Sequence, residues 1–236
     1  MTLALKSWIE VRRRLLIGLL GWAFVTVTFY FSMRDDSAAH SDTARAVSAI
    51  CSVETVMLMC FGAILAGSGV MTQLCNSASA RMPDSVLFTL ALPVSRRSLF
   101  LSRALLGALG VLLMMVLFWA LLPVLFASLT GAPTLRVLLG AILFQLVAAA
   151  LAYSFGLLGT CLFSDMTLSW VIGAAGGIGG IGAGLRWGPL VRFLNFASGA
   201  TYMTTGQVSW IGLAICVALS CSFVFAAVRT IERREF

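Results

Sequence analysis

Long apolar stretches alternate with short polar segments along this chain. Six windows are apolar over about 20 residues, the length that an α-helix needs to cross a hydrocarbon core of about 30 Å. The windows are residues 15–33, 47–70, 99–126, 137–163, 168–185 and 209–228. Strand-like alternation of polar and apolar positions is absent, which argues against a membrane β-barrel. The pattern predicts an all-α polytopic membrane protein with six transmembrane helices in a single transmembrane domain, residues 1–236.

Composition supports the same class. Hydrophobic residues make up 60% of the chain and charged residues 11%, and the mean hydropathy is +1.01. In soluble globular proteins about a quarter of the residues are charged.

The basic residues of the polar segments are unevenly distributed between the two sides of the predicted bundle. One side carries Lys6, Arg12, Arg13, Arg14, Arg81, Arg96, Arg97, Arg103, Arg229, Arg233 and Arg234. The other side carries Arg34, Arg45, Arg136, Arg186 and Arg192, the first two diluted by nearby aspartates. The positive-inside rule therefore places both termini in the cytoplasm, as expected for an integral protein of a bacterial cytoplasmic membrane. This asymmetry and contact with anionic lipid explain the net charge of +7 without nucleic acid.

Residues 1–14 are amphipathic if they are helical. Leu5, Trp8, Ile9 and Val11 share one face, while Lys6, Glu10, Arg13 and Arg14 share the other. Such a segment is expected to lie in the cytoplasmic membrane interface. The apolar run that follows lacks a small-residue cleavage site, so it is interpreted as a retained first span and not as a signal peptide.

Several kinds of chemistry are excluded by missing residues. His40 is the only histidine and Lys6 the only lysine, so His-based acid–base catalysis and multi-histidine metal sites are ruled out. No GxxxxGK[ST] motif is present, so the chain is not itself a Walker-type ATPase. Gly177, Gly179 and Gly182 do spell GxGxxG, but inside an apolar window and without the flanking strand and acidic residue of a dinucleotide site. We expect no enzyme activity and no cofactor in this chain.

Six cysteines are present, most of them in the apolar windows. They are Cys51, Cys60, Cys75, Cys161, Cys216 and Cys221. None forms a CxxC pair, so neither a disulfide framework nor a zinc site fits, and small buried hydrophobes are the favoured interpretation. A Cu(I) path along Cys51, Met57, Met59 and Cys60 is a minor alternative, because soft sulfur ligands suit that ion.

Small residues gather in the fifth window. Gly173, Gly176, Gly177, Gly180 and Gly184 make overlapping GxxxG spacings. This spacing lets helix backbones approach closely. The window is predicted to pack against a neighbouring helix or a second protomer, or else to rearrange during function.

Glu54 is the one clear charged residue inside a window. A charge at a helix centre costs about 2.5–3.5 kcal/mol on insertion scales, so Glu54 is expected to face the bundle interior. It is a candidate position on a transport path, hydrated through an outward cavity. Alternatively it is hydrogen-bonded by a neighbour such as Gln145.

Residues 81–103 read RMPDSVLFTLALPVSRRSLFLSR. Pro83 and Asp84 suit the first turn of a short helix, and Pro93 ends it. Ser95 can cap the next helix, whose start Arg96 and Arg97 hold at the cytoplasmic surface. A short, largely apolar helix in a cytoplasmic segment must bury its side chains on the membrane or in a groove of a soluble partner.

This arrangement resembles the permease subunits of ABC-2 type exporters. Residues 92–96 match the family's Leu-Pro-Val-Ser-Arg turn, and the tail at residues 233–236 matches its basic–acidic end. Trp8 and Glu10 are similar to its Trp-x-x-Glu element with one residue fewer between them, while residues 84–86 depart from the family's acidic-Gly-Thr pattern.

The resemblance implies that residues 81–97 form a coupling segment that docks into a separate ABC-type ATPase. The coupling residues carried over are Pro83, Asp84, Leu87, Phe88, Pro93, Val94, Ser95, Arg96 and Arg97, and those of the interfacial helix are Trp8, Glu10 and Arg13. Two ATPase copies would bind ATP and Mg, and the permease would pair with a second copy, as a homodimer or with a paralogue. The family also places re-entrant external helices between the fifth and sixth spans, for which residues 187–196 are the candidate.

The function implied is export of an apolar or amphipathic cargo, such as a lipid, drug or peptide, because the spans contain few polar groups. The main alternative is a passive channel or a non-transporting accessory protein, which composition does not distinguish. A membrane-embedded enzyme is disfavoured because Glu54, Asp84 and Asp165 are isolated in the sequence.

Overall fold

The fold is described from a computed structural model, which describes residues 12, 15–16, 18–28, 31, 43–70, 96–126, 135–162 and 188–233. This part of the chain contains helices and no strand, so the predicted all-α class is confirmed. A first helix includes Gly18–Thr28. It is followed by α2 (Thr43–Val70), α4 (Arg96–Phe126), α5 (Leu135–Leu162), α7 (Gly188–Ala197), α8 (Ala200–Thr205) and α9 (Trp210–Arg233).

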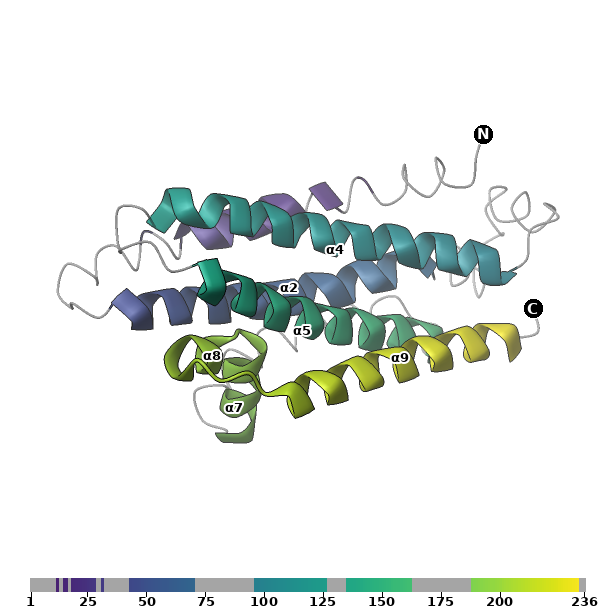
Figure 1. Cartoon of the computed structure of the whole chain (residues 1–236). Helices are drawn as coiled ribbons and strands as arrows, with labels where there is room; N and C mark the ends of the chain where they lie inside the picture. Colours follow the sequence, from purple (N-terminus) through teal and green to yellow (C-terminus); the bar gives the residue numbers. More distant parts are fainter. Residues whose placement is uncertain are drawn as a thin grey trace.

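The long helices form an elongated bundle in which α2, α5 and α9 run in one direction and α4 runs in the opposite direction (Figure 1). α5 lies at its centre and packs closely against both α2 and α9, while α2 also packs against α4. The start of α4 and the end of α9 share one end of the bundle (Figure 1). The starts of α2, α5 and α9 lie at the other end, beside α7 and α8.

The distribution of side chains is inverted relative to that of a soluble protein. Polar side chains, among them Glu54, Gln145 and Ser198, are buried inside the bundle. Large apolar side chains are exposed along its outside, for example Leu20 at 71%, Phe24 at 72% and Ile211 at 78%. An exposed apolar surface of this extent is typical of helices that face lipid.

Three helices are long and apolar enough to cross a membrane by themselves: Phe100–Leu121, Leu139–Gly159 and Trp210–Arg233. Two shorter apolar helices, Gly18–Thr28 and Cys51–Gly62, lie in the predicted first and second spans. These five helical regions overlap five of the six predicted windows, whereas window 168–185, with its glycines, lies outside the described residues. The chain is therefore an integral membrane protein by its helices, while the full set of six spans stays a prediction.

The observed helices differ from the predicted windows at their ends. α2 begins at Thr43, four residues before window 47–70, and α9 continues to Arg233, five residues beyond window 209–228. The added residues include Arg45, Arg229 and Arg233. A hydropathy window stops at the first charges, but the backbone hydrogen bonds of a helix continue past the hydrocarbon core.

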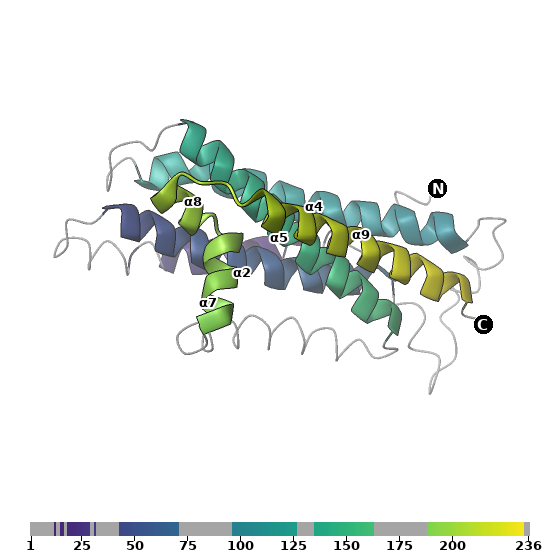
Figure 2. The ribbon, with the colours of Figure 1, turned by 60° about the horizontal axis from the view of Figure 1, so that its bottom comes forward.

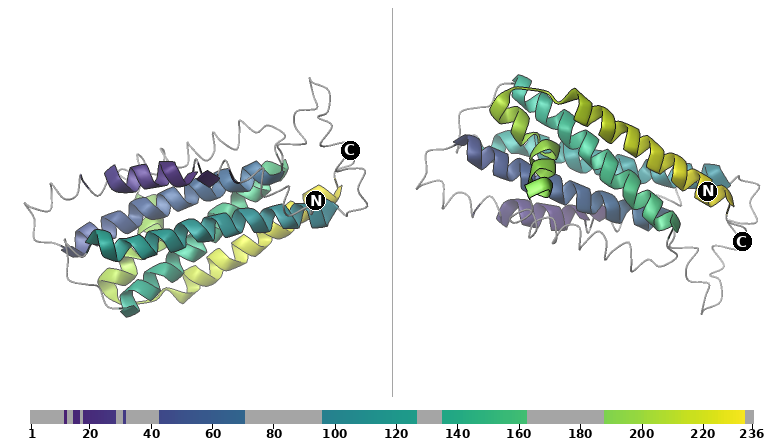
Figure 3. Two further views of the ribbon diagram at one scale, coloured as in Figure 1. Left: turned by 90° about the horizontal axis from the view of Figure 1, so that it is seen from above. Right: turned by 90° about the horizontal axis from the view of Figure 1, so that it is seen from below.

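Two short helices, α7 and α8, do not follow the bundle axis. α7 lies across α2, and α8 connects it back to the start of α9 (Figures 2 and 3). Gly199 joins them in a left-handed conformation with φ 72°, which suits glycine, and it sits against the Ala141 backbone of α5. Helical structure at residues 187–196 was therefore correctly anticipated, with Gly188–Ala197 as the observed range.

Close approach of helices depends on glycines of α4 and α5. A Cβ atom at Gly107 would collide with the Tyr153 ring, one at Gly110 with Leu15, and one at Gly140 with the Tyr202 ring. Small residues at these crossings allow side chains of one helix to sit against the backbone of the next. Within the described residues, glycine packing of the kind predicted for the fifth window thus occurs in the third and fourth.

Candidate functional site

The most polar region of the bundle interior surrounds Glu54, in the middle of α2. Its side chain is 3% exposed, so the prediction that it faces the interior is confirmed. Both carboxylate oxygens accept hydrogen bonds from the indole Nε1 of Trp22, at 2.7 and 2.8 Å. Trp22 belongs to the first helix and is itself buried. A carboxylate surrounded by hydrocarbon requires such a donor, because an unpaired buried charge is costly.

A second set of hydrogen bonds lies one turn before Glu54, at the backbone carbonyl of Cys51. Thr55 Oγ1 donates to this carbonyl at 2.7 Å, and Gln145 Nε2 of α5 donates to it at 3.3 Å. The other end of the Gln145 amide accepts a bond of 2.9 Å from Trp119 Nε1 of α4. Gln145 thus forms hydrogen bonds with both α2 and α4, and its side chain is fully buried. The donor to Glu54 is Trp22 and not Gln145, the neighbour considered from the sequence.

Aromatic rings connect these two sets of hydrogen bonds. Phe118 of α4 makes an edge-to-face contact with Trp22, with ring centroids 6.4 Å apart, and another with Trp119 at 5.6 Å. Both tryptophans direct their N–H groups at acceptors of the interior. Buried tryptophans usually find such a partner. The first helix, α2, α4 and α5 are therefore joined at one level by a continuous group of polar and aromatic side chains.

The helix pair α7–α8 is attached to the same region. Ser52 Oγ of α2 donates to Ser198 Oγ at 3.3 Å, and Ser198 Oγ also accepts from the backbone N–H of Ala200 at 3.3 Å. Ser198 is fully buried between the two short helices. We call the set Trp22, Cys51, Ser52, Glu54, Thr55, Trp119, Gln145 and Ser198 the interior polar cluster.

Apolar contacts fix α8 on the other side of the junction. The Tyr202 ring lies over Gly140 of α5 and against Phe144, with ring centroids 5.9 Å apart. Phe144 also contacts Phe196 of α7 edge to face at 5.2 Å. Leu213 and Cys216 of α9 complete this second hydrophobic core. Both short helices are therefore held by α2, α5 and α9 together.

Glu54 is the acidic member of the interior polar cluster, and the hydrogen bonds of the cluster join carboxyl, indole, amide, hydroxyl and backbone groups. In the described part of the chain no group of three or more His, Cys, Asp or Glu residues is arranged to hold a metal ion. The described members of the Cu(I) alternative, Cys51, Met57, Met59 and Cys60, follow one another along α2.

Most of the other predicted site residues lie outside the described residues. This holds for Pro83, Asp84, Leu87, Phe88, Pro93, Val94, Ser95, Trp8, Glu10, Arg13, Gly173, Gly176, Gly177, Gly180 and Gly184. Arg96 and Arg97 are the first two residues of α4, so the helix begins directly after the Leu-Pro-Val-Ser stretch. The capping role of Ser95 stays a prediction, because Ser95 lies outside the described residues.

Sequence reasoning missed Trp22, Trp119 and Ser198. A signal was present for the tryptophans, since an indole N–H in the middle of an apolar window needs an acceptor in the bundle. With Glu54 and Gln145 as the conspicuous acceptors in neighbouring windows, pairing could have been proposed. No comparable signal marks Ser198, because serines are common in helix connections.

The chain was compared with known proteins at three levels. No family model matches it, and neither the curated proteins nor the solved structures contain a significant match.

Proposed function

We propose that this chain is the membrane-spanning subunit of an ATP-driven exporter of the ABC-2 type. In this proposal a separate ATPase binds ATP and Mg at the end of the bundle where α4 starts. Motion is then transmitted through residues 81–97. The cavity of a dimer of this chain, as a homodimer or with a paralogue, switches from inward-facing to outward-facing. Both termini lie in the cytoplasm of a bacterial cell.

The observation that carries the proposal is the placement of α7 and α8. Two short helices that do not cross the bundle precede the last span, at the end opposite to the start of α4 (Figure 1). The resemblance in the sequence implies external re-entrant helices at this position. Such helices are tolerated at membrane depth only where they are buried in protein or line a cavity, and α2, α5 and α9 pack against these.

The distribution of arginines supports the same orientation. Arg96, Arg97 and Arg103 near the start of α4 and Arg229 and Arg233 near the end of α9 share one end of the bundle. The opposite end carries Arg45, Arg136 and Arg192. The larger number of basic residues indicates the cytoplasmic side.

The interior supports an apolar or amphipathic cargo, such as a lipid, drug or peptide. The buried polar side chains are already paired with one another, as in the Trp22–Glu54 and Trp119–Gln145 bonds. A strongly hydrated cargo would need many more polar contacts than this interior provides. Glu54 is the one acidic group that a cavity opening between the first helix and α2 would expose.

The experiment that tests the proposal is affinity purification of the full chain from its native host in mild detergent. Mass spectrometry should identify a Walker-motif ATPase in near one-to-one stoichiometry. Leu87→Asp and Phe88→Asp should remove the ATPase, while Leu109→Asn, an exposed position in α4, should keep it. A stable preparation of this chain alone, or retention of the ATPase by the Leu87 and Phe88 variants, would contradict the proposal and favour a channel or accessory protein.

Transport is the second readout. In vesicles containing the complex, Leu87→Asp should abolish ATP-dependent export while the bundle keeps its unfolding midpoint. Unchanged export in this variant would show that the coupling segment has another role.

A further inference from the structure

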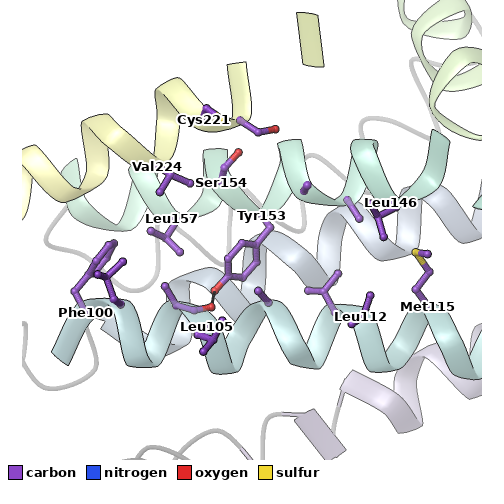
Figure 4. Close-up of a pocket in the computed structure, with 17 residues that line it drawn as sticks. Phe100, Leu105, Leu112, Met115, Leu146, Tyr153, Ser154, Leu157, Cys221 and Val224 are labelled. Atoms are coloured by element: carbon purple, nitrogen blue, oxygen red, sulfur yellow. Dashed lines mark hydrogen bonds between the residues drawn. The ribbon is translucent and has the colours of Figure 1, made fainter. Parts of the chain in front are cut away.

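A long apolar groove lies between α4, α5 and α9, away from the interior polar cluster (Figure 4). Its volume is about 570 Å³, within the range of small-molecule sites. The α4 side is formed by residues between Phe100 and Met115, the α5 side by residues between Leu146 and Leu157, and the α9 side by Ser220, Cys221 and Val224.

The groove is open to the outside of the bundle. Leu105 and Leu112 of α4 line it and are largely exposed, whereas Met115 and Leu157 form its buried floor. In a membrane-spanning bundle this outside is the hydrocarbon of the bilayer. The groove must therefore be filled by lipid or by protein, because water is excluded there.

The few polar groups in the groove are already satisfied by backbone carbonyls. Tyr153 Oη donates to the Ala104 carbonyl at 2.6 Å, across the floor from α5 to α4 (Figure 4). Ser154 donates to the Leu151 carbonyl and Ser220 to the Cys216 carbonyl, at 2.9 and 2.8 Å. A ligand in the groove thus meets almost only hydrocarbon, which favours an acyl chain over a polar molecule.

The length of the groove exceeds the depth of one membrane leaflet. From Phe100 to Met115 the rise along α4 is about 22 Å, compared with about 15 Å for half of a bilayer core. The groove begins within two turns of the start of α4 and extends past the middle of the helix. An acyl chain that enters from that end can therefore lie in the groove over the full depth of the leaflet.

Basic residues occur at the end of α4 and α9 that lies nearest to the Phe100 end of the groove. α4 carries Arg96, Arg97 and Arg103 in its first turns, and α9 carries Arg229 and Arg233 in its last turns. Arg229 is exposed, with its guanidinium 5.6 Å from the Phe225 ring centroid. Glu232 is the only acidic residue at this end among the described positions. Basic pockets between membrane helices bind the headgroups of anionic lipids.

We propose that the α4–α5–α9 groove binds an anionic phospholipid of the leaflet at the Arg96 end, with one acyl chain along Tyr153 and the phosphate at the arginine-rich end of α4 and α9. The inference depends on the membrane character of the chain and not on the proposed export function. A lipid bound there would bridge α4 and α9, which are otherwise in limited direct contact.

Photolabelling of the full chain in nanodiscs tests the proposal. The probes are phosphatidylglycerol and phosphatidylcholine that carry the same diazirine-modified acyl chain. Phosphatidylglycerol should label peptides of α4, α5 and α9 around Leu105, Ala150 and Cys221 at least fivefold more than phosphatidylcholine does. Ala108→Phe and Ala150→Phe, which fill the groove, should reduce this labelling at least fivefold, while Ala120→Phe on the exposed surface of α4 should not.

A second pair of variants separates the headgroup from the acyl chain. Arg229→Gln should reduce the preference for phosphatidylglycerol about threefold or more, whereas Arg192→Gln at the opposite end should leave it unchanged. Equal labelling by the two lipids, or labelling unaffected by Ala108→Phe and Ala150→Phe, would overturn the proposal. Cross-links through Cys221 between two copies of the chain would assign the groove to a protein interface and overturn it as well.

Discussion

The two faces of α5 lead to two very different environments. On one side Gln145 joins α2 and α4 in the interior polar cluster, where the polar groups of four helices are paired. On the other side Leu146, Ala150 and Tyr153 line the apolar groove, which the Tyr153–Ala104 hydrogen bond crosses. Lipid provides no hydrophobic drive for helix association, so the polar side specifies how the helices meet. The groove side leaves room that an apolar ligand can occupy.

The contrast also explains where substitutions should be tolerated. A paired buried polar group is costly to break, because the remaining partner is left without its bond. A groove wall of exposed leucines tolerates a change of side chain more easily, because its surroundings are fluid. The following predictions are ordered from the largest expected effect to the smallest.

Trp22→Phe should have the largest effect on stability. It leaves the buried Glu54 carboxyl group without this donor and should lower the free energy of unfolding by about 3 kcal/mol. The measurement is unfolding by SDS titration from mixed micelles. The double variant Trp22→Phe with Glu54→Leu should be more stable than Trp22→Phe alone, because no uncompensated carboxylate remains. A double variant that is less stable than the single one would show that the Trp22–Glu54 bond is not the reason.

Gly140→Ala should cost about 2 kcal/mol, because the added methyl group would displace the Tyr202 ring from α5. Gly159→Ala in the same helix is the control. No atom lies within 4 Å of the position that its methyl group would take, so the helix should gain roughly 0.5–1 kcal/mol from the higher helix propensity of alanine. Equal effects of the two substitutions in SDS titration would contradict the close packing of α8 on α5.

Tyr153→Phe tests the Tyr153–Ala104 hydrogen bond, which crosses the groove. The free energy of unfolding should fall by about 1 kcal/mol, because the Ala104 carbonyl remains part of the hydrogen-bonded backbone of helix α4. Ser154→Ala, which removes only a bond within α5, should change the free energy of unfolding by less than about 0.5 kcal/mol. A loss in Tyr153→Phe as large as in Trp22→Phe would remove the distinction between the two faces of α5.

Ser198→Ala should have the smallest global effect, roughly 0.5–1 kcal/mol, because the bond to Ser52 is long and partly buried. Its local effect should be clear, since the N–H of Ala200 also loses its acceptor. Hydrogen exchange of the amides in Ala200–Thr205 should accelerate severalfold. Ser222→Ala on the exposed face of α9 should leave that exchange rate unchanged.

Some parts of the site could be predicted from the sequence, and others could not. Glu54 was identified because a charge in an apolar window is conspicuous and must be turned inward. Its partner was not identified, because Trp22 lies 32 positions earlier. The groove left no signal at all, since its leucines and alanines are indistinguishable in the sequence from those that pack or face lipid.

The sequence by itself determined that this is a membrane protein of α-helices and, within a few residues, where the described long helices run. Hydropathy identifies the segments that lie in hydrocarbon. A backbone in hydrocarbon must form its hydrogen bonds within its own segment, so these segments are helices. Only the tertiary structure decided which apolar residues are buried. It alone placed Trp22 on Glu54 and Gln145 between Trp119 and Cys51, and it separated α4 from α9 far enough to leave a groove. These features depend on the rotation and spacing of helices, which the geometry of facing side chains sets and which a uniformly apolar pattern does not encode.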